Sequence, residues 1–156
     1  LNSAHVVAGN NLTTTKAVAE VDSVAQLNPS KVFIMVGLND VNFGSKSAEA
    51  IAEDLITLAE AVKDSCPSAK VYILSLLPVT SGFEARDTNK ITQSAIDDVN
   101  DTVSVLAASA GYTYIDVASA YKNGAGYLNP DYSTNGMNLH HDYYAFLLNS
   151  IAEVAK

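Results

Sequence analysis

The chain has 156 residues, of which 48% are hydrophobic and 17% are charged, and its formal net charge is −8. This composition suits a compact domain with a full core and argues against a disordered chain. Lys and Arg form no cluster, so we expect neither nucleic acid nor an anionic membrane surface as a partner. No apolar run approaches the length of about 18 residues that spans a bilayer. We therefore expect one domain over residues 1–156 and no membrane span.

The sequence leaves the compartment open. Its single cysteine, Cys66, excludes an intrachain disulfide and says little about redox conditions. No signal peptide is visible, but a mature secreted chain would look the same. Extracellular and cytoplasmic locations both stay open, with secretion slightly favoured.

Strands and helices are expected to alternate along the chain. Apolar segments predict strands at residues 4–8, 32–36, 70–76 and 112–117. Amphipathic segments predict helices at 13–27, 47–63, 87–110 and 142–154, with Asp87 as an N-cap. The last helix is expected to bury Tyr144, Leu147, Leu148 and Ile151, and a long loop, 119–139, precedes it. This alternation predicts an α/β fold of three layers, α/β/α, with a parallel sheet covered on both faces.

The segment from Lys31 to Asp40 is the most informative part of the sequence. Its apolar run, 32–36, is typical of a strand buried on both faces, and the run breaks at Gly37-Leu38-Asn39-Asp40. Ligand sites in parallel sheets form where the strands end. Asn39 offers there an uncharged amide donor, which can stabilise an oxyanion. An ordinary strand-ending turn would also use Gly, Asn and Asp, for conformational reasons alone.

Several segments together resemble the esterases and lipases called SGNH or GDSL hydrolases, which have a flavodoxin-like fold of three layers. Gly37-Leu38-Asn39-Asp40 matches their G-x-N-D block, so the resemblance makes Asn39 an oxyanion-hole donor. Val7-Ala8-Gly9-Asn10-Asn11 is similar to their glycine block, in which Gly9 would supply a backbone N–H to the same hole. Asn135-Gly136-Met137-Asn138-Leu139 falls where the family carries D-G-x-H-L.

Two departures from the family pattern bear on activity. The G-D-S block that holds the nucleophilic serine has no counterpart, and Ser3 lies too close to Asn39 in sequence to replace it. Asn135 and Asn138 occupy the positions of the catalytic Asp and His, and an amide has no useful basicity. His140 is a candidate replacement base, although helix-start histidines more often cap the helix or face solvent.

The resemblance implies an ester hydrolase for acyl or acetyl esters, such as those on carbohydrates, of which this chain is a degenerate or incomplete copy, inactive alone. Two alternatives stay open: a non-catalytic binding or scaffold domain on the same fold, and a flavodoxin-like ligand-binding domain. No cofactor is expected, and no spacing of His, Cys and carboxylates suggests a metal site.

The missing block also has a structural consequence. In the family the first strand lies inside the sheet, between the second and the third. A chain without that strand would leave unpaired backbone groups, so we expect either that a missing N-terminal segment supplies the strand or that the sheet closes by another route, of which pairing with a second chain is one.

Overall fold

The computed structural model describes residues 4–86 and 90–155, and it contains a parallel sheet with the strand order β1-β2-β3. The strands are β1 (Lys31–Ile34), β2 (Lys70–Leu74) and β3 (Thr113–Ile115). Lys31 pairs with Lys70, and Tyr72 pairs with Thr113. The central strand β2 is buried from its second residue onward, which explains its uninterrupted apolar sequence. The α/β class and the parallel sheet expected from the sequence are confirmed.

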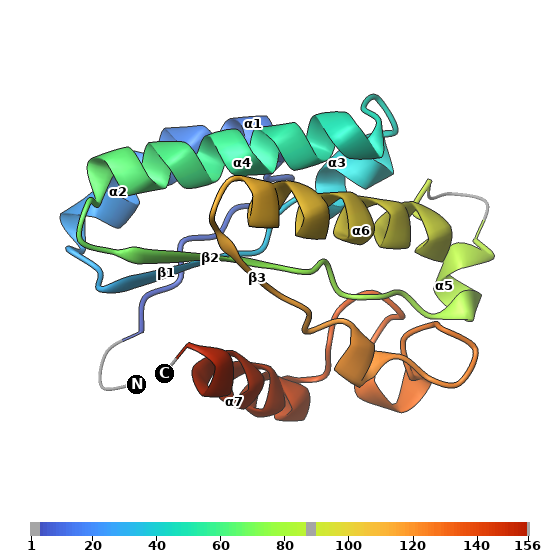
Figure 1. The fold of residues 1–156 in the computed structure, drawn as a ribbon. Helices are drawn as coiled ribbons and strands as arrows, with labels where there is room; N and C mark the ends of the chain where they lie inside the picture. Colours follow the sequence, from blue (N-terminus) through green and yellow to red (C-terminus); the bar gives the residue numbers. More distant parts are fainter. Residues whose placement is uncertain (1–3, 87–89, 156) are drawn as a thin grey trace.

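Helices cover both faces of this sheet, and the layers are seen edge-on in Figure 1. One face carries α1 (Thr14–Ala17), η1 (Val18–Glu20), α2 (Val21–Gln26), α3 (Leu38–Phe43), α4 (Ala48–Ser65) and α6 (Gln93–Ser109). The other face carries α7 (Tyr144–Val154). The remaining short helices are α5 (Ser81–Glu84), η2 (Ser119–Tyr121), η3 (Pro130–Tyr132) and η4 (His141–Tyr143). Each face of the sheet has its own cluster of buried side chains.

The helix α4 illustrates why sequence periodicity predicted the longer elements correctly. The side chain of Ser47 accepts a hydrogen bond from the backbone N–H of Ala50 and so caps the first turn. The apolar stripe of this helix is buried throughout, and it consists of Ile51, Leu55, Leu58 and Val62. Burial of this stripe against the sheet fixes the helix, because three- and four-residue spacing puts all four side chains on one face.

Several sequence expectations need correction. Residues 4–8 form no strand and are exposed, because among the described residues no neighbouring strand pairs with them. The predicted helix 13–27 is divided into α1, η1 and α2. In α7, Leu147 and Ile151 are buried, whereas Tyr144 and Leu148 are 47% and 49% exposed and lie on an adjacent stripe. Asp87, the expected N-cap, lies outside the described residues, as does Ser3, and α6 begins after Thr92, whose side chain caps it.

No helix in residues 4–86 and 90–155 is long and apolar enough to cross a membrane.

Candidate functional site

The turn after β1 places Asn39 at the carboxyl edge of the sheet. Gly37 has a φ of +133°, a backbone conformation that side chains other than glycine rarely adopt. A Cβ there would lie 3.4 Å from Ile51 Cγ2, so the turn is also closely packed against α4. The helix α3 starts directly afterwards, and Asn39 is its second residue. Figure 1 shows α3 and α5 at the same end of the molecule, beyond the carboxyl ends of the strands.

The amide of Asn39 is held in place by the segment that carries the other predicted oxyanion donor. Asn39 Nδ2 donates a hydrogen bond to the backbone carbonyl of Leu12, at 2.8 Å. The N–H of Leu12 in turn donates to the carbonyl of Gly9, at 3.3 Å. An amide NH₂ carries two hydrogens, so this arrangement uses one and leaves the second for a ligand. The structure therefore brings Asn39 and the Gly9 segment together through Leu12.

A buried polar network beneath this contact was missed by the sequence analysis. Asp40 is 2% exposed and accepts hydrogen bonds from the backbone N–H and the hydroxyl of Thr14, both at 2.9 Å. The Thr14 hydroxyl also lies 3.1 Å from Asp54 Oδ2. Lys46 Nζ contacts Asp40 at 3.3 Å and pairs closely with Asp54. These contacts tie α1 and α4 to the turn that carries Asn39.

The charges of this network stabilise one another. The hydrogen bond that Lys46 donates to the Asp54 carboxylate raises the pKa of Lys46 above its usual value, against the opposing effect of burial. The same bond lowers the pKa of Asp54. The sequence signal that could have revealed the network is the run of three threonines at 13–15, at the start of the predicted helix. Thr13 is the cap of α1, since its side chain accepts from the N–H of Lys16.

Asn135 stabilises a tight hairpin at residues 133–139. Its Oδ1 accepts hydrogen bonds from the N–H groups of Met137, at 3.0 Å, and Asn138, at 2.8 Å. An antiparallel bridge between Ser133 and Leu139 closes the hairpin. Both asparagines are exposed. The oxygen of Asn135 is therefore used to hold the turn, as is usual for Asx turns.

The hairpin is anchored to the segment that follows β2. The carbonyl of Gly136 accepts a hydrogen bond from the N–H of Thr80, at 2.8 Å. A Cβ on Gly136 would lie 2.6 Å from Thr80 Oγ1 and 2.8 Å from Phe83 Cβ, so only glycine fits this close approach. Within the described part of the chain, no hydrogen bond joins Asn135 or Asn138 to Asn39 or Gly9. Their convergence on one site stays a prediction.

His140 lies just beyond this hairpin, at the start of η4. Its Nδ1 lies 3.1 Å from Asp142 Oδ2 and 3.5 Å from the N–H of Asp142. His141 Nε2 lies 2.7 Å from the other oxygen of the same carboxylate. His140 thus caps the turn and His141 faces solvent, with 82% of its side chain exposed. The three consecutive side chains also gather as possible metal ligands, a grouping that the sequence analysis did not foresee because it looked for ligands spaced along the chain.

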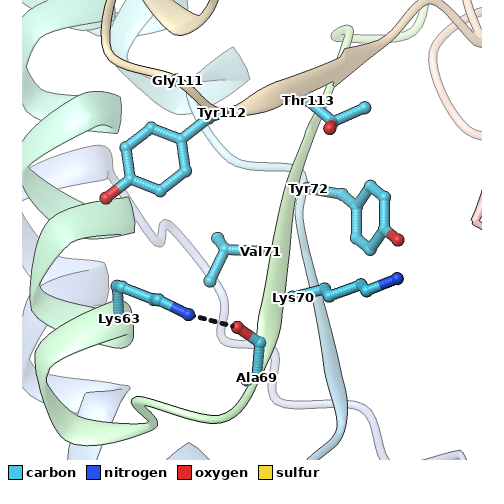
Figure 2. A pocket seen from close by; sticks show the side chains of 8 residues that line it. All are labelled: Lys63, Ala69, Lys70, Val71, Tyr72, Gly111, Tyr112 and Thr113. Atoms are coloured by element: carbon cyan, nitrogen blue, oxygen red, sulfur yellow. Dashed lines mark hydrogen bonds between the residues drawn. The ribbon is translucent and has the colours of Figure 1, made fainter.

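Two hollows in the surface lie away from these residues. One, of about 240 Å³, is at the amino ends of β2 and β3. Figure 2 shows Lys63 and Tyr112 on one side of β2 and Lys70 and Tyr72 on the other, so their polar groups do not converge. Lys63 Nζ is already bound to the carbonyl of Ala69, at 2.9 Å. Ligands of parallel sheets bind at the opposite edge, so this hollow is not the candidate site.

The second hollow, of about 380 Å³, lies between α6 and the end of β3. Its lining includes Asp97, Asp101 and Asp116, with Lys122 paired to Asp97 at 2.7 Å. Burial, followed by the charge of Asp116, raises the pKa of Tyr114 well above its usual range. Neither hollow is lined by the predicted site residues.

One curated protein is similar to this chain in sequence. The N-acylneuraminate cytidylyltransferase of Escherichia coli O18:K1:H7 is 29% identical over 126 residues, and the match covers 80% of this chain. The chain spans 28% of the length of that curated relative.

Two solved structures share the fold. A GDSL-like lipase from Bacteroides thetaiotaomicron superposes with a TM-score of 0.77 at 22% identity, covering 92% of this chain and 71% of the other. A lipase/acylhydrolase from Enterococcus faecalis gives a TM-score of 0.72 at 20% identity, covering 92% and 70%. A model of the GDSL-like lipase/acylhydrolase family matches residues 2–142, which is almost the whole sequence. The chain therefore belongs to the GDSL-like lipase/acylhydrolase family.

Proposed function

We propose that the Gly9–Asn39 region is the oxyanion-binding part of an SGNH-type ester hydrolase site. The observation that carries this proposal is the fixed amide of Asn39, held by the Leu12 carbonyl at 2.8 Å with one N–H left for a ligand. A donor that is already oriented stabilises a developing oxyanion without reorganisation. The substrate class is acyl or acetyl esters, with esters on carbohydrates favoured, because the curated relative is named for N-acylneuraminate, a carbohydrate.

The same proposal holds that residues 1–156 alone do not turn over esters. The sequence contains no G-D-S block, and asparagines stand at 135 and 138. Without a nucleophile and its base, the site can only bind the ester and stabilise an oxyanion. His140 is the proposed replacement base. In that role Nδ1, which accepts from the N–H of Asp142 in the structure, would instead carry a hydrogen and donate it to Asp142 Oδ2, which lies 3.1 Å away, so that Nε2 could take the proton.

An ester assay tests the absence of turnover. We expect hydrolysis of p-nitrophenyl acetate by the chain to equal that of the Asn39→Ala variant and of buffer. Turnover that a serine-directed organophosphonate abolishes would contradict this expectation and would reveal a nucleophilic serine among residues 1–156.

Binding of acetate, the product of acetyl-ester hydrolysis, tests the oxyanion site itself. In a titration followed by NMR, we expect the side-chain amide signals of Asn39 to shift saturably. Asn149→Ala is the matched control, because Asn149 is an exposed asparagine on α7 and its loss should leave the shift unchanged. Acetate that shifts other signals but not those of Asn39 would refute the proposed site.

The non-catalytic binding domain is the second candidate, and the structure offers one observation in its favour. The side chain of Asn135 is used to hold its hairpin, which is a structural role. An acetylated sugar and the same sugar without its acetyl group separate the two candidates. An ester-directed site should give the Asn39 shift only with the acetylated sugar, whereas a carbohydrate-binding domain should respond equally to both.

We also propose a partner for the free edge of β1. Among residues 4–86 and 90–155, β1 pairs with β2 and with no other strand. Met35, directly after β1, is an exposed apolar residue, at 36%. A strand from an N-terminal segment or from a second chain would pair the open edge.

A further inference from the structure

The segment that begins η4 places three potential metal ligands in consecutive positions. His140 Nδ1 and His141 Nε2 lie 3.1 Å and 2.7 Å from the two carboxylate oxygens of Asp142. One ligand atom from each of the three side chains lies within 4.8 Å of the other two. Ligand atoms around a tetrahedral zinc ion are about 3.3 Å apart, given zinc–ligand distances of about 2.0 to 2.1 Å. Small side-chain rotations would therefore bring all three atoms into a first coordination shell.

The backbone that carries these ligands is well anchored. The N–H of His140 donates to the carbonyl of Tyr132 at 2.7 Å, and the His140 carbonyl accepts from the N–H of Tyr143 at 3.0 Å. The preceding residue, Leu139, is buried in the core cluster beneath the sheet. The side chains themselves are exposed, at 41% for His140, 82% for His141 and 66% for Asp142. A fixed backbone with open side chains leaves room for water in the remaining coordination positions.

From this geometry we propose that His140, His141 and Asp142 form a binding site for a divalent transition-metal ion, with Zn²⁺ as the preferred probe. Two imidazoles and one carboxylate suit zinc and its neighbours, whereas Ca²⁺ and Mg²⁺ prefer an all-oxygen shell. The positive end of α7 works against a cation, but the carboxylate of Asp142 in the first turn and the net charge of −8 act in the opposite direction. The proposal does not rest on ester turnover, and a bound ion would occupy His140 and Asp142, the residues proposed above as replacement base and orienting carboxylate.

Calorimetric titration with ZnCl₂ tests the proposal on the untagged, EDTA-treated and dialysed chain. We expect saturable binding of one Zn²⁺ per chain and none of Ca²⁺. His141→Ala and Asp142→Asn should each weaken Zn²⁺ binding at least about tenfold, since even partners outside the first shell contribute that much. His5→Ala is the matched control, because His5 is the third histidine of the sequence, is exposed and lies in the segment before α1. That variant should bind like the unmodified chain.

Thermal unfolding provides a second readout that needs no heat of binding. At one Zn²⁺ concentration, the ion should raise the Tm of the unmodified chain and of His5→Ala by more than that of His141→Ala, because stabilisation by a ligand grows with its affinity for the folded state. Circular dichroism before each titration confirms that the variants are folded. Absence of saturable Zn²⁺ binding, or equal binding by His141→Ala and the unmodified chain, would overturn the proposal.

Discussion

At the scale of single residues, the buried pair of Thr14 and Asp40 anchors the turn that carries Asn39. Asp40 directly follows Asn39, and both of its oxygens are bound by Thr14. A buried carboxylate is tolerated only with such partners, because its charge loses the solvation of water. The contact spans 26 residues of sequence, so local patterns could not reveal it. The G-x-N-D motif predicted where Asn39 lies, but not what holds it.

Lys46 makes this network sensitive to pH. The folded pKa of Asp54 is lowered, so its stabilising contribution is present above the ordinary carboxyl pKa and is lost as pH falls through the lowered value. The pKa of Lys46 is raised, so its contribution is complete below the ordinary lysine pKa and is lost as pH rises through the raised value. The contribution of the Lys46–Asp54 pair to stability should therefore be greatest between these limits.

We expect Lys46→Met to reduce the free energy of unfolding most between roughly pH 5 and pH 9. At lower and at higher pH, the difference in unfolding free energy between the variant and the unmodified chain should become smaller. Urea denaturation at pH 3, 7 and 11 measures this difference. Lys16→Met is the control, since Lys16 is an exposed lysine on the neighbouring helix α1. A difference of constant size across the three pH values would show that Lys46 acts through packing instead of charge.

At the scale of elements, the exit from β2 is held by side chains of α6. The Asn100 amide accepts from the N–H of Leu76 at 2.7 Å and donates to the Leu76 carbonyl at 3.0 Å. Gln93 Oε1 accepts from the N–H of Val79 at 2.9 Å. These buried amides satisfy the backbone where strand pairing stops. Leu76 also packs near Gly37, with its methyl carbons 3.6 Å from where a Cβ would stand, so this exit supports the Asn39 turn.

Asn100→Ala should destabilise the protein by about 2 to 4 kcal/mol, because it leaves the N–H and the carbonyl of Leu76 buried without partners. Asn100→Asp keeps the acceptor and loses the donor, so we expect an intermediate loss. Urea denaturation at neutral pH measures both. Asn149→Ala, an exposed asparagine on α7, should change stability by no more than about 0.5 kcal/mol. A loss for Asn100→Ala no greater than this control would be inconsistent with the proposed role.

Elements with strong periodicity were predictable, and elements that depend on a neighbour were not. The stripe of α4 and the apolar run of β2 each carry their own signal, so both were found within a few residues. Residues 4–8 have the composition of a strand, yet composition cannot supply a pairing partner, and the segment stays irregular and exposed. The grouping of His140, His141 and Asp142 was not expected, because the sequence analysis considered only ligands spaced along the chain.

At the scale of the whole molecule, the sheet is complete on its faces but open at β1. Helices cover both faces in Figure 1, while in the described part of the chain β1 has a neighbouring strand, β2, on one side only. Backbone groups of alternate residues in β1 point toward the open side, because neighbouring residues of a strand face opposite edges. Natural proteins protect such edges with charge, proline or a covering segment. Lys31 supplies one charge at the start of β1, but its amino group is bound to the carbonyl of Ala155, at 2.5 Å.

The open edge leads to a prediction about self-association. In the absence of another strand donor, we expect the purified chain to form dimers or larger species as its concentration rises, which sedimentation velocity measures. Met35→Lys should shift the chain toward the monomer, because a charged side chain just beyond β1 opposes the approach of a second strand. Val105→Lys is the matched control: Val105 is 65% exposed on α6, away from β1, and its replacement adds the same charge. Equal association of both variants would mean that like-charge repulsion or another surface governs the equilibrium. A monomer at every concentration, with the amide of Phe33 as protected from hydrogen exchange as the amides of β2, would show that the edge of β1 is already covered.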